Sequence, residues 1–132
     1  MLDQLTAGLN FQSNALLLRS QRQQVLASNI ANADTPGYIA RDFDFAQALK
    51  TAAGVPSSAV STTDTRHLRL GGADPLRPEL AYTVQTSPSQ DGNSVDLDRE
   101  RANFVDNSIR YESTLRFING HVKTMLSAIT GQ

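Results

Sequence analysis

The chain has 132 residues, of which 39% are hydrophobic and 6% aromatic, and its formal net charge is -1. This composition predicts one small domain or one elongated unit, and it is too apolar for a wholly disordered chain. The balanced charge excludes a basic surface that would collect nucleic acid or an anionic membrane, and the absence of cysteine excludes disulfides and thiolate metal sites.

All five prolines lie in the middle of the chain, at positions 36, 56, 75, 78 and 88. Because proline breaks helices, the two proline-free ends predict long helices with an irregular or β-containing insert between them. The predicted fold class is therefore mainly α, with the N- and C-terminal helices packed as an α-helical coiled coil. We expect residues 1–35 and 96–132 to form the core domain, and residues 36–95 to form a turn, a flexible loop and a small β-hairpin insert.

The first helix is predicted from about residue 5 to residue 32. Two series of residues seven apart run through this segment: Leu2, Leu9, Leu16, Gln23 and Ile30, and Leu5, Gln12, Arg19, Leu26 and Ala33. This is a heptad pattern with three polar positions in its seam. Only Arg19 and Arg22 carry a charge between residues 4 and 33. Since neutral amides and hydroxyls leave water more readily than charges do, we expect other protein to surround this helix on several sides.

The sequence Thr35-Pro36-Gly37-Tyr38 predicts an abrupt end to the first helix. Proline disfavours the helical conformation for the residue before it, and Pro36-Gly37 fits the central positions of a type II turn, where glycine supplies the positive φ. The helix should end near residues 32–34. Apolar groups that follow the turn are expected to fold back onto the helix or to dock on a neighbour: Tyr38, Ile39, Phe43 and Phe45.

The insert carries weaker signals. Residues 51–65 are small and polar and predict a flexible loop. In residues 79–86 the side chains Leu80, Tyr82 and Val84 lie on one face of an extended chain, and this alternation predicts a strand. Residues 66–70 are its candidate hairpin partner. The segment DGNSVDLDRE at 91–100 lacks the glycine and glutamate positions of a calcium-binding EF-hand, so we interpret it as a turn that leads into a helix cap.

The second helix is predicted to begin after a cap at Asp96 or Ser94 and to continue almost to the C-terminus. Its two heptad series are Leu97, Phe104, Tyr111, Ile118 and Met125, and Arg101, Ser108, Leu115, Val122 and Ile129. From Tyr111 onward this seam is wholly apolar. It can pack against the first helix, against another chain, or against both, and the pattern leaves these alternatives open.

The sequence contains no enzyme motif. His67 and His121 have no neighbouring metal-ligand spacing, and no nucleophile elbow, phosphate loop, dinucleotide fingerprint or zinc-protease helix occurs. We therefore expect no catalytic, cofactor or metal site. The N-terminal sequence MLDQLTAGLNFQ is neither basic nor continuously apolar, so we also expect neither a cleaved signal peptide nor a membrane span.

The stretch LASNIANADTPGYIARDFDF at 26–45 resembles the N-terminal signature of the bacterial flagellar axial proteins, which form rod, hook and filament. The Arg-Asp-Phe-Asp-Phe sequence at 41–45, the short length and DGNSVDLDRERANFVDNSIRYE at 91–112 resemble the proximal rod branch of that family. The resemblance covers about residues 1–50 and 88–132.

The resemblance implies a structural subunit of the basal-body rod that assembles through helix–helix contacts into a tubular drive shaft. Such a shaft transmits torque and surrounds the export channel. The implied partners are copies of the chain, neighbouring rod and basal-body proteins and the flagellar type III export apparatus, with no nucleic acid and no direct membrane insertion. The implied location is the rod in the periplasmic space, reached from the cytoplasm without a cleaved signal peptide.

The residues expected to carry assembly come from the signature, from the seams and from the segment after the turn. They are Leu9, Leu16, Leu26, Asn29, Ile30, Asn32, Thr35, Pro36, Gly37, Tyr38, Phe43, Phe45, Tyr111, Leu115, Ile118, Val122, Met125 and Ile129. Exposed seams also predict that a free monomer is poorly ordered at its ends. The alternative is a soluble helical-hairpin binding module, such as a secretion chaperone or adaptor, which would fold alone and bind one partner on one face.

Overall fold

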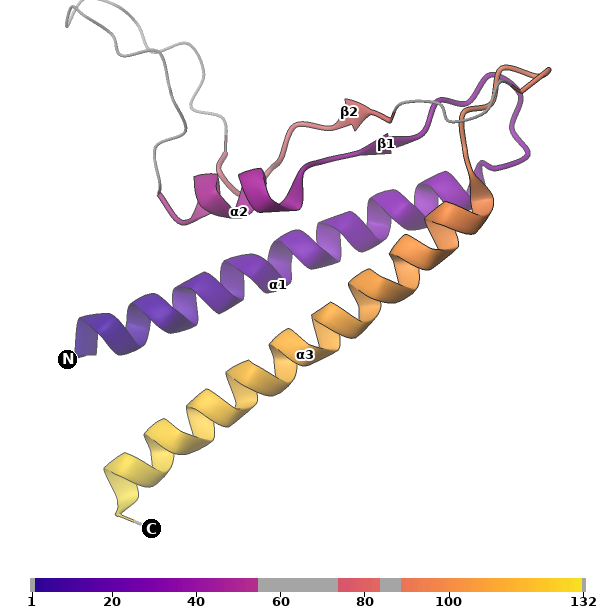
Figure 1. Ribbon diagram of the computed structural model, residues 1–132. Helices are drawn as coiled ribbons and strands as arrows, with labels where there is room; N and C mark the ends of the chain where they lie inside the picture. Colours follow the sequence, from indigo (N-terminus) through magenta and orange to yellow (C-terminus); the bar gives the residue numbers. More distant parts are fainter. Residues whose placement is uncertain (1, 55–73, 84–88, 132) are drawn as a thin grey trace, which may run out of the picture.

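The computed structural model describes residues 2–54, 74–83 and 89–131. In these residues the elements follow the chain as α1 (Leu2–Ala31), β1 (Arg41–Asp42), α2 (Phe45–Ala52), β2 (Ala81–Tyr82) and α3 (Leu97–Thr130), shown in Figure 1. The predicted fold class is confirmed: the chain is mainly helical, with long terminal helices and a small antiparallel sheet between them. Helix α1 begins earlier than predicted, at Leu2, and ends one residue before the predicted position.

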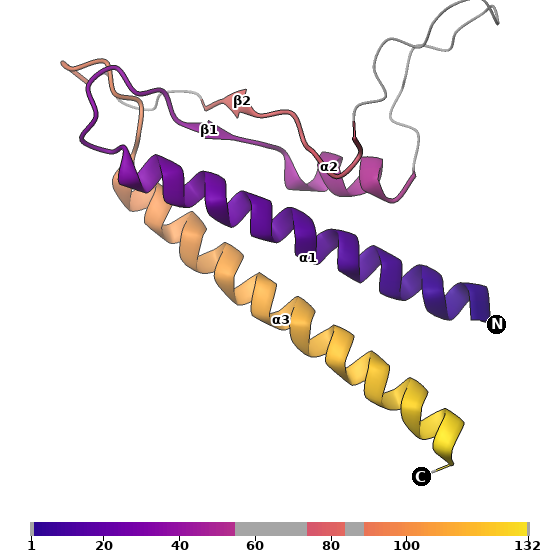
Figure 2. The same ribbon diagram turned by 180° about the vertical axis from the view of Figure 1, so that it is seen from behind.

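The two long helices form an open V. The end of α1 and the start of α3 meet, and the helices then diverge toward the two chain termini, as Figures 1 and 2 show from opposite sides. We call the end where they meet the closed end and the end that holds both termini the open end. The chain is therefore elongated, with close helix packing at one end of its long axis.

Helix α3 begins as predicted. Asp96 is its N-cap, and the carboxylate Oδ1 accepts a hydrogen bond from the backbone N–H of Arg99 at 3.2 Å. Asp98 and Glu100 in the first turn face the positive end of the helix dipole. Ser94, the other candidate cap, has a different partner, because its hydroxyl accepts from the backbone N–H of Ala40 at 2.8 Å.

Helix α1 lies between the insert and α3. In both ribbon views β1, β2 and α2 cover one side of α1 and α3 covers another (Figures 1 and 2). Polar side chains of α1 reach both neighbours: Gln21 donates to the backbone oxygen of Leu76 in the insert at 2.8 Å, and Gln23 donates to Ser108 of α3 at 2.6 Å. Two neighbours within the same chain therefore account for much of the low charge of this helix.

The predicted strand in residues 79–86 is confirmed in part, as β2. Its partner is β1, with Arg41 opposite Tyr82 and Asp42 opposite Ala81. The segment 66–70, considered as its hairpin partner, lies outside the described residues. The sheet instead joins two segments about 40 residues apart in the chain, because the turn after α1 carries β1 back along the helix.

Helix α2 was not predicted. Asp44 caps it by accepting a hydrogen bond from the backbone N–H of Gln47 at 3.1 Å, and its apolar face packs on α1. The cluster there joins Leu18, Phe43 and Ala48 with partly buried Phe45, Leu49 and Ala52. Residues 51–52 thus belong to a helix, so the predicted loop was wrong at its start, and residues 55–65 lie outside the described part. An eight-residue helix is too short for a periodic signal, and packing stabilises it.

Candidate assembly interface

The contact between α1 and α3 near the closed end is polar. The buried residues of α3 are Glu100, Asn107 and Thr114, which are seven apart. The Asn107 Nδ2 atom donates to the backbone oxygen of Arg19 at 2.8 Å and to Oε1 of Gln23 at 2.6 Å. Polar heptad positions of α1 therefore meet polar positions of α3, and each helix supplies the partners that allow the other to bury amide groups.

The two predicted seam series of α3 differ in their exposure within the subunit. Leu97, Phe104, Tyr111, Ile118 and Met125 are all partly buried. In the second series Arg101, Leu115, Val122 and Ile129 are exposed in the subunit, and only Ser108 is partly buried. That this second series packs against another chain stays a prediction. The buried series begins one residue earlier, at Glu100. Periodicity counts apolar residues, so it missed these polar ones. Glu100 and Asn107 have hydrogen-bond partners on α1, whereas the Thr114 hydroxyl donates to the Arg110 backbone oxygen of α3 at 2.8 Å.

Asn29 holds three segments together at the closed end. Its side chain is fully buried, and Nδ2 donates to the backbone oxygen of Arg41 at 2.7 Å and to Oε2 of Glu100 at 3.0 Å. Its Oδ1 accepts from the Tyr38 hydroxyl at 3.1 Å and from the backbone N–H of Arg41 at 3.2 Å. The Asn29 amide thus bonds to both the N–H and the C=O group of Arg41, as a neighbouring strand would. The same amide also links β1 to Glu100 of α3.

The predicted type II turn is confirmed. Gly37 has a φ of 72°, and the backbone N–H of Tyr38 donates to the backbone oxygen of Thr35 at 3.2 Å. The buried side chain of Asn93 contacts the backbone of this turn. Asn93 Nδ2 lies 3.0, 2.8 and 2.9 Å from the backbone oxygens of Asn32, Ala33 and Thr35. Carbonyl groups at the end of α1 are thereby satisfied by a side chain from just before α3.

Asn93 was missed by the sequence analysis, which interpreted residues 91–100 only as the approach to a helix cap. The sequence signal for this turn was Asp-Gly-Asn at 91–93. Gly92 has a φ of 74° and lies against the backbone of Gly37. A Cβ atom added to Gly92 would lie 3.7 Å from the Cα atom of Gly37. Two glycine turns therefore sit face to face. The N-terminal and C-terminal parts of the chain meet there.

Two arginines of α1 hold the insert. Arg22 forms a bidentate pair with Asp42 of β1, with nitrogen–oxygen distances of 3.2 and 2.8 Å, and this hydrogen bonding raises the pKa of Arg22. Arg19 places its guanidinium 4.3 Å from the centre of the Phe45 ring, and burial lowers the pKa of Arg19. Both arginines of α1 thus interact with the insert of the same subunit.

The predicted assembly residues divide into three groups by exposure. Those buried inside the subunit are Leu26, Asn29 and Phe43. Those partly buried are Leu9, Leu16, Ile30, Asn32, Tyr38, Phe45, Tyr111, Ile118 and Met125. Those exposed are Thr35, Pro36, Gly37, Leu115, Val122 and Ile129. The first group can affect assembly only by fixing the shape of the subunit, whereas the last group is available to a neighbour.

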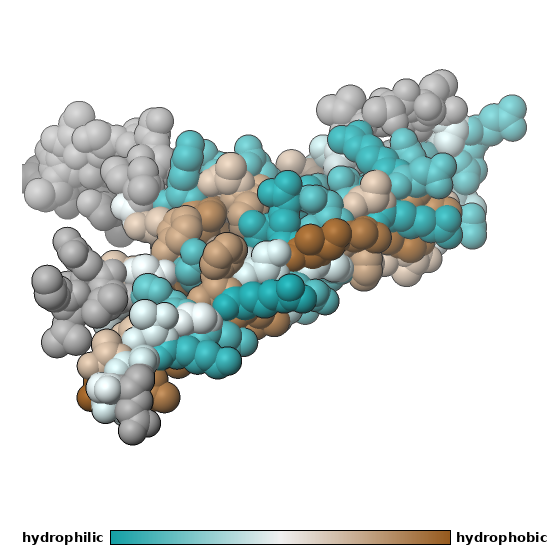
Figure 3. Space-filling model, turned by 60° about the horizontal axis from the view of Figure 1, so that its bottom comes forward, coloured by the Kyte–Doolittle hydropathy of each residue, from teal (hydrophilic) through white to brown (hydrophobic). Residues whose placement is uncertain are grey.

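Large apolar side chains of α3 are exposed in the half of the helix near the open end. Leu115 is 36% exposed, Val122 48%, Leu126 60% and Ile129 81%. On α1, Phe11 and Leu17 are each 44% exposed. Figure 3 shows such apolar surface lying open among hydrophilic side chains along the helices. A self-contained hairpin would bury a heptad seam of this length, so this surface marks the candidate interface.

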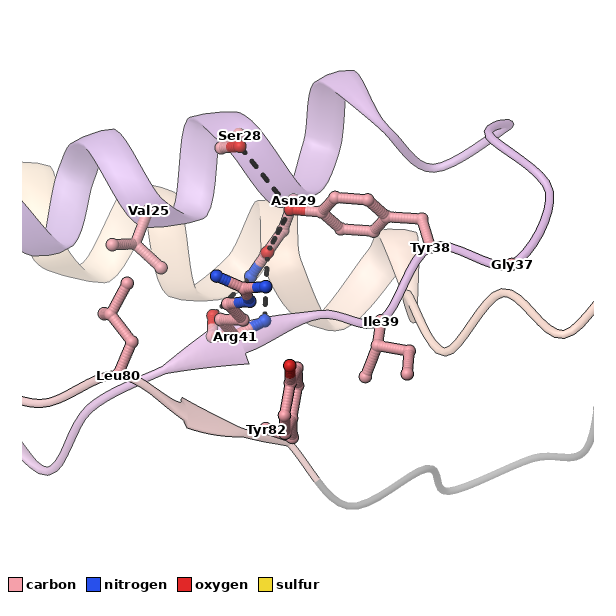
Figure 4. Close-up of a pocket in the computed structure, with 9 residues that line it drawn as sticks. All are labelled: Val25, Ser28, Asn29, Gly37, Tyr38, Ile39, Arg41, Leu80 and Tyr82. Carbon is pink, nitrogen blue, oxygen red and sulfur yellow. Dashed lines mark hydrogen bonds between the residues drawn. The ribbon is translucent and has the colours of Figure 1, made fainter.

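A groove of about 500 Å³ lies at the closed end between α1 and the small sheet, and Figure 4 shows its lining. The lining residues are Val25, Ser28, Asn29, Gly37, Tyr38, Ile39, Arg41, Leu80 and Tyr82. Their polar groups bond to one another: the Tyr38 hydroxyl lies 3.4 Å from Ser28 Oγ as well as contacting Asn29. Arg41 lies over the Tyr82 ring at 5.2 Å. These polar groups of the groove therefore have partners within the chain, while Ile39, Leu80 and Tyr82 along it are exposed.

The described part of the chain shows no cluster of three or more acidic or histidine side chains arranged to hold a metal ion. Among the described helices, none is long and apolar enough to cross a membrane. What the geometry defines is an elongated helical subunit with a hydrogen-bonded closed end and an apolar open end. The chain therefore falls in the class of elongated, mainly helical proteins whose long terminal helices leave large apolar side chains exposed.

Comparison with known proteins agrees with this class. Residues 9–38 match the family described as "Flagella basal body rod protein". The chain is 48% identical to the flagellar basal body rod protein FlgB of Escherichia coli strain K12, over 98% of this chain and 97% of the relative. It is 45% identical to FlgB of Salmonella typhimurium strain LT2, over 99% of each. It is 41% identical to FlgB of Cereibacter sphaeroides, over 94% of each. The chain belongs to the FlgB family of flagellar basal body rod proteins.

Proposed function

We propose that this chain, a structural subunit of the flagellar basal-body rod, joins its neighbours through the open ends of α1 and α3. The resulting tube is a drive shaft that transmits torque and surrounds the export channel. Residues 1–35 and 96–132 act as the core domain of that tube, and residues 36–95 as the insert. The observation that carries the proposal is the exposure of Leu115, Val122 and Ile129 on α3 in a chain related over its full length to rod proteins.

The closed end supports the mechanical part of the proposal. Asn29 and Asn93 join α1, the turn and the start of α3 by buried hydrogen bonds that have fixed directions. A joint of this kind sets the angle between the helices, because amide bonds to backbone groups tolerate little rotation. Torque applied at one subunit can then pass to the next without opening the V.

We extend the proposal to partners and location. The partners are copies of the chain, neighbouring rod and basal-body proteins, and the flagellar type III export apparatus, with neither nucleic acid nor direct membrane insertion. The site of action is the rod in the periplasmic space, reached without a cleaved signal peptide. The role is mechanical and not enzymatic. No observation favours the alternative of a secretion chaperone or adaptor.

A fractionation experiment tests this role. The gene for the chain is replaced by an epitope-tagged copy in motile cells, and detergent-extracted basal bodies are purified. We expect the tagged chain in the basal-body fraction, and we expect a matched deletion strain to lack both rods and motility. Recovery of the chain only in the cytoplasm, bound to an exported protein, together with unchanged rods in the deletion strain, would support the chaperone alternative instead.

A further inference from the structure

Gln23 and Asn107 form a reciprocal contact between the middle parts of α1 and α3. Asn107 Nδ2 donates to Gln23 Oε1 at 2.6 Å and to the backbone oxygen of Arg19 at 2.8 Å. Gln23 Nε2 donates to Ser108 Oγ at 2.6 Å and lies 3.4 Å from the backbone oxygen of Phe104. Each amide therefore bonds to both a side chain and the backbone of the facing helix. We call Gln23 and Asn107 the amide pair.

Stability alone does not account for the amide pair. Asn107 is 1% exposed, and its Oδ1 atom has no hydrogen-bond partner among the described residues. A buried acceptor without a partner is unfavourable, whereas apolar side chains at both positions would leave no amide atom unpaired. In packed helices, a buried amide of this kind lowers stability and fixes the alignment of one helix on the other.

The apolar positions of α3 do not define one alignment by themselves. Phe104, Tyr111, Ile118 and Met125 recur every seven residues, and all four are partly buried. A slip of α3 by seven residues therefore replaces one apolar residue by the next, and at the α-helical rise it amounts to about 10 Å. We call residues 115–130 the open half of α3. This half, from the same copy or from another, offers α1 an alternative apolar surface.

The amide pair distinguishes the observed alignment from these alternatives. After a slip of seven residues Asn107 lies level with Leu16 or Ile30, and neither of these side chains can form a hydrogen bond. Docking of α1 on the open half of another copy separates Gln23 from Asn107 as well. In each case a buried amide loses its partner, and the alternative pairing becomes less favourable than the observed one.

We propose that Gln23 and Asn107 are pairing-specificity residues, which make α1 accept α3 of its own chain in one alignment and disfavour docking on the open half of α3. The contact also has a cost, since one buried oxygen stays unpaired among the described residues. The inference goes beyond the proposed rod function. It concerns the inside of one subunit, so it can fail while the rod function stands.

Spin-label distances in the isolated chain test this inference. The chain contains no cysteine, so Ser13→Cys and Ala102→Cys, both at exposed positions, place one label on α1 and one on α3. The doubly labelled chain is diluted in unlabelled chain, and the distance is measured by double electron–electron resonance. We expect one narrow distance with the amide pair intact. With Gln23→Leu and Asn107→Leu together, we expect a second population displaced by about 10 Å, or a broad distribution.

Urea unfolding separates this role from a merely structural one. Asn107→Leu alone should raise the unfolding equilibrium constant at least about fivefold, because Gln23 Oε1 loses its donor. The two leucines together should not raise this constant above that of wild type. Leu26→Ala is the control for stability: Leu26 is fully buried, so this variant is less stable but should keep the single distance. Exchanging the amides, with Gln23→Asn and Asn107→Gln, should also keep it.

A single, unshifted distance in the chain with both leucines would overturn the inference, as would an equally broad distribution in the Leu26→Ala control. A chain with both leucines that is less stable than wild type, or that does not fold, would overturn it too, because the amides would then serve stability. These results leave the rod function standing. Absence of the wild-type chain from basal bodies would instead overturn the proposed function and leave this inference unchanged.

Discussion

Replacing Asn29 by aspartate should lower the free energy of unfolding by about 3 kcal/mol or more, because it removes two buried hydrogen bonds and adds a buried charge. The substitution preserves the size of the side chain and removes only the amide donor. That donor lies 2.7 Å from the Arg41 backbone oxygen and 3.0 Å from Oε2 of Glu100. A carboxylate in its place would face a second carboxylate, and like charges at this distance repel.

Urea unfolding followed by circular dichroism measures this effect, with Asn10→Asp as the matched control. Asn10 is on the same helix but exposed, so the same change in charge should alter stability by no more than about 0.5 kcal/mol. We expect the Asn29 variant also to be impaired in rod assembly, since the angle between α1 and α3 depends on this joint. Equal unfolding midpoints for the two variants would show that Asn29 does not hold the closed end.

Replacing Val122 by aspartate should abolish rod assembly and motility while leaving the isolated subunit as stable as wild type. Val122 is 48% exposed in the subunit, so a charge there remains in contact with water. In the assembled tube the same charge would be buried against a neighbour without a partner, which costs several kcal/mol at every repeated interface. We therefore expect the free energy of unfolding of the isolated subunit to change little, while rod assembly fails.

Thr124→Asp is the control for this variant. Thr124 is two residues further along α3, on another side of the helix, and it is exposed, with its hydroxyl bonded to the backbone oxygen of Gly120. We expect cells that carry this control to swim. Motility is measured as swimming in soft agar, and assembly as rods in purified basal bodies. If cells with the Val122 variant swim and form rods, the open half of α3 is not part of the interface.

Much of the fold could be predicted because its signals are local. The absence of proline from both ends, the Pro36-Gly37 pair and the carboxylate of Asp96 each act on the backbone within a few residues, and all three predictions are confirmed. Helix α2 could not be predicted in this way. Its stability depends on the packing of Phe45 and Ala48 onto Leu18, and this contact is visible only once the turn has folded back.

The candidate interface shows the same division. Heptad periodicity grouped Leu115 and Val122 with Ile118 and Met125 in one seam. Within the subunit Ile118 and Met125 are partly buried and Leu115 and Val122 are exposed, while the buried positions of α3 are Glu100, Asn107 and Thr114. Glu100 and Asn107 are buried with hydrogen-bond partners that lie on α1, so the period of α3 alone cannot reveal them. That the apolar positions face a neighbouring chain stays a prediction.

Hydrogen exchange resolved along the sequence most directly tests whether the open end of the subunit is completed by its neighbours. We expect that amides of residues 115–130 exchange rapidly in a dilute solution of the isolated chain, while those of residues 97–114 are protected by the closed end. In purified rods both segments should be protected. Strong and equal protection of both halves of α3 in the dilute, isolated chain would contradict the account, because the open end would then be complete without a neighbour.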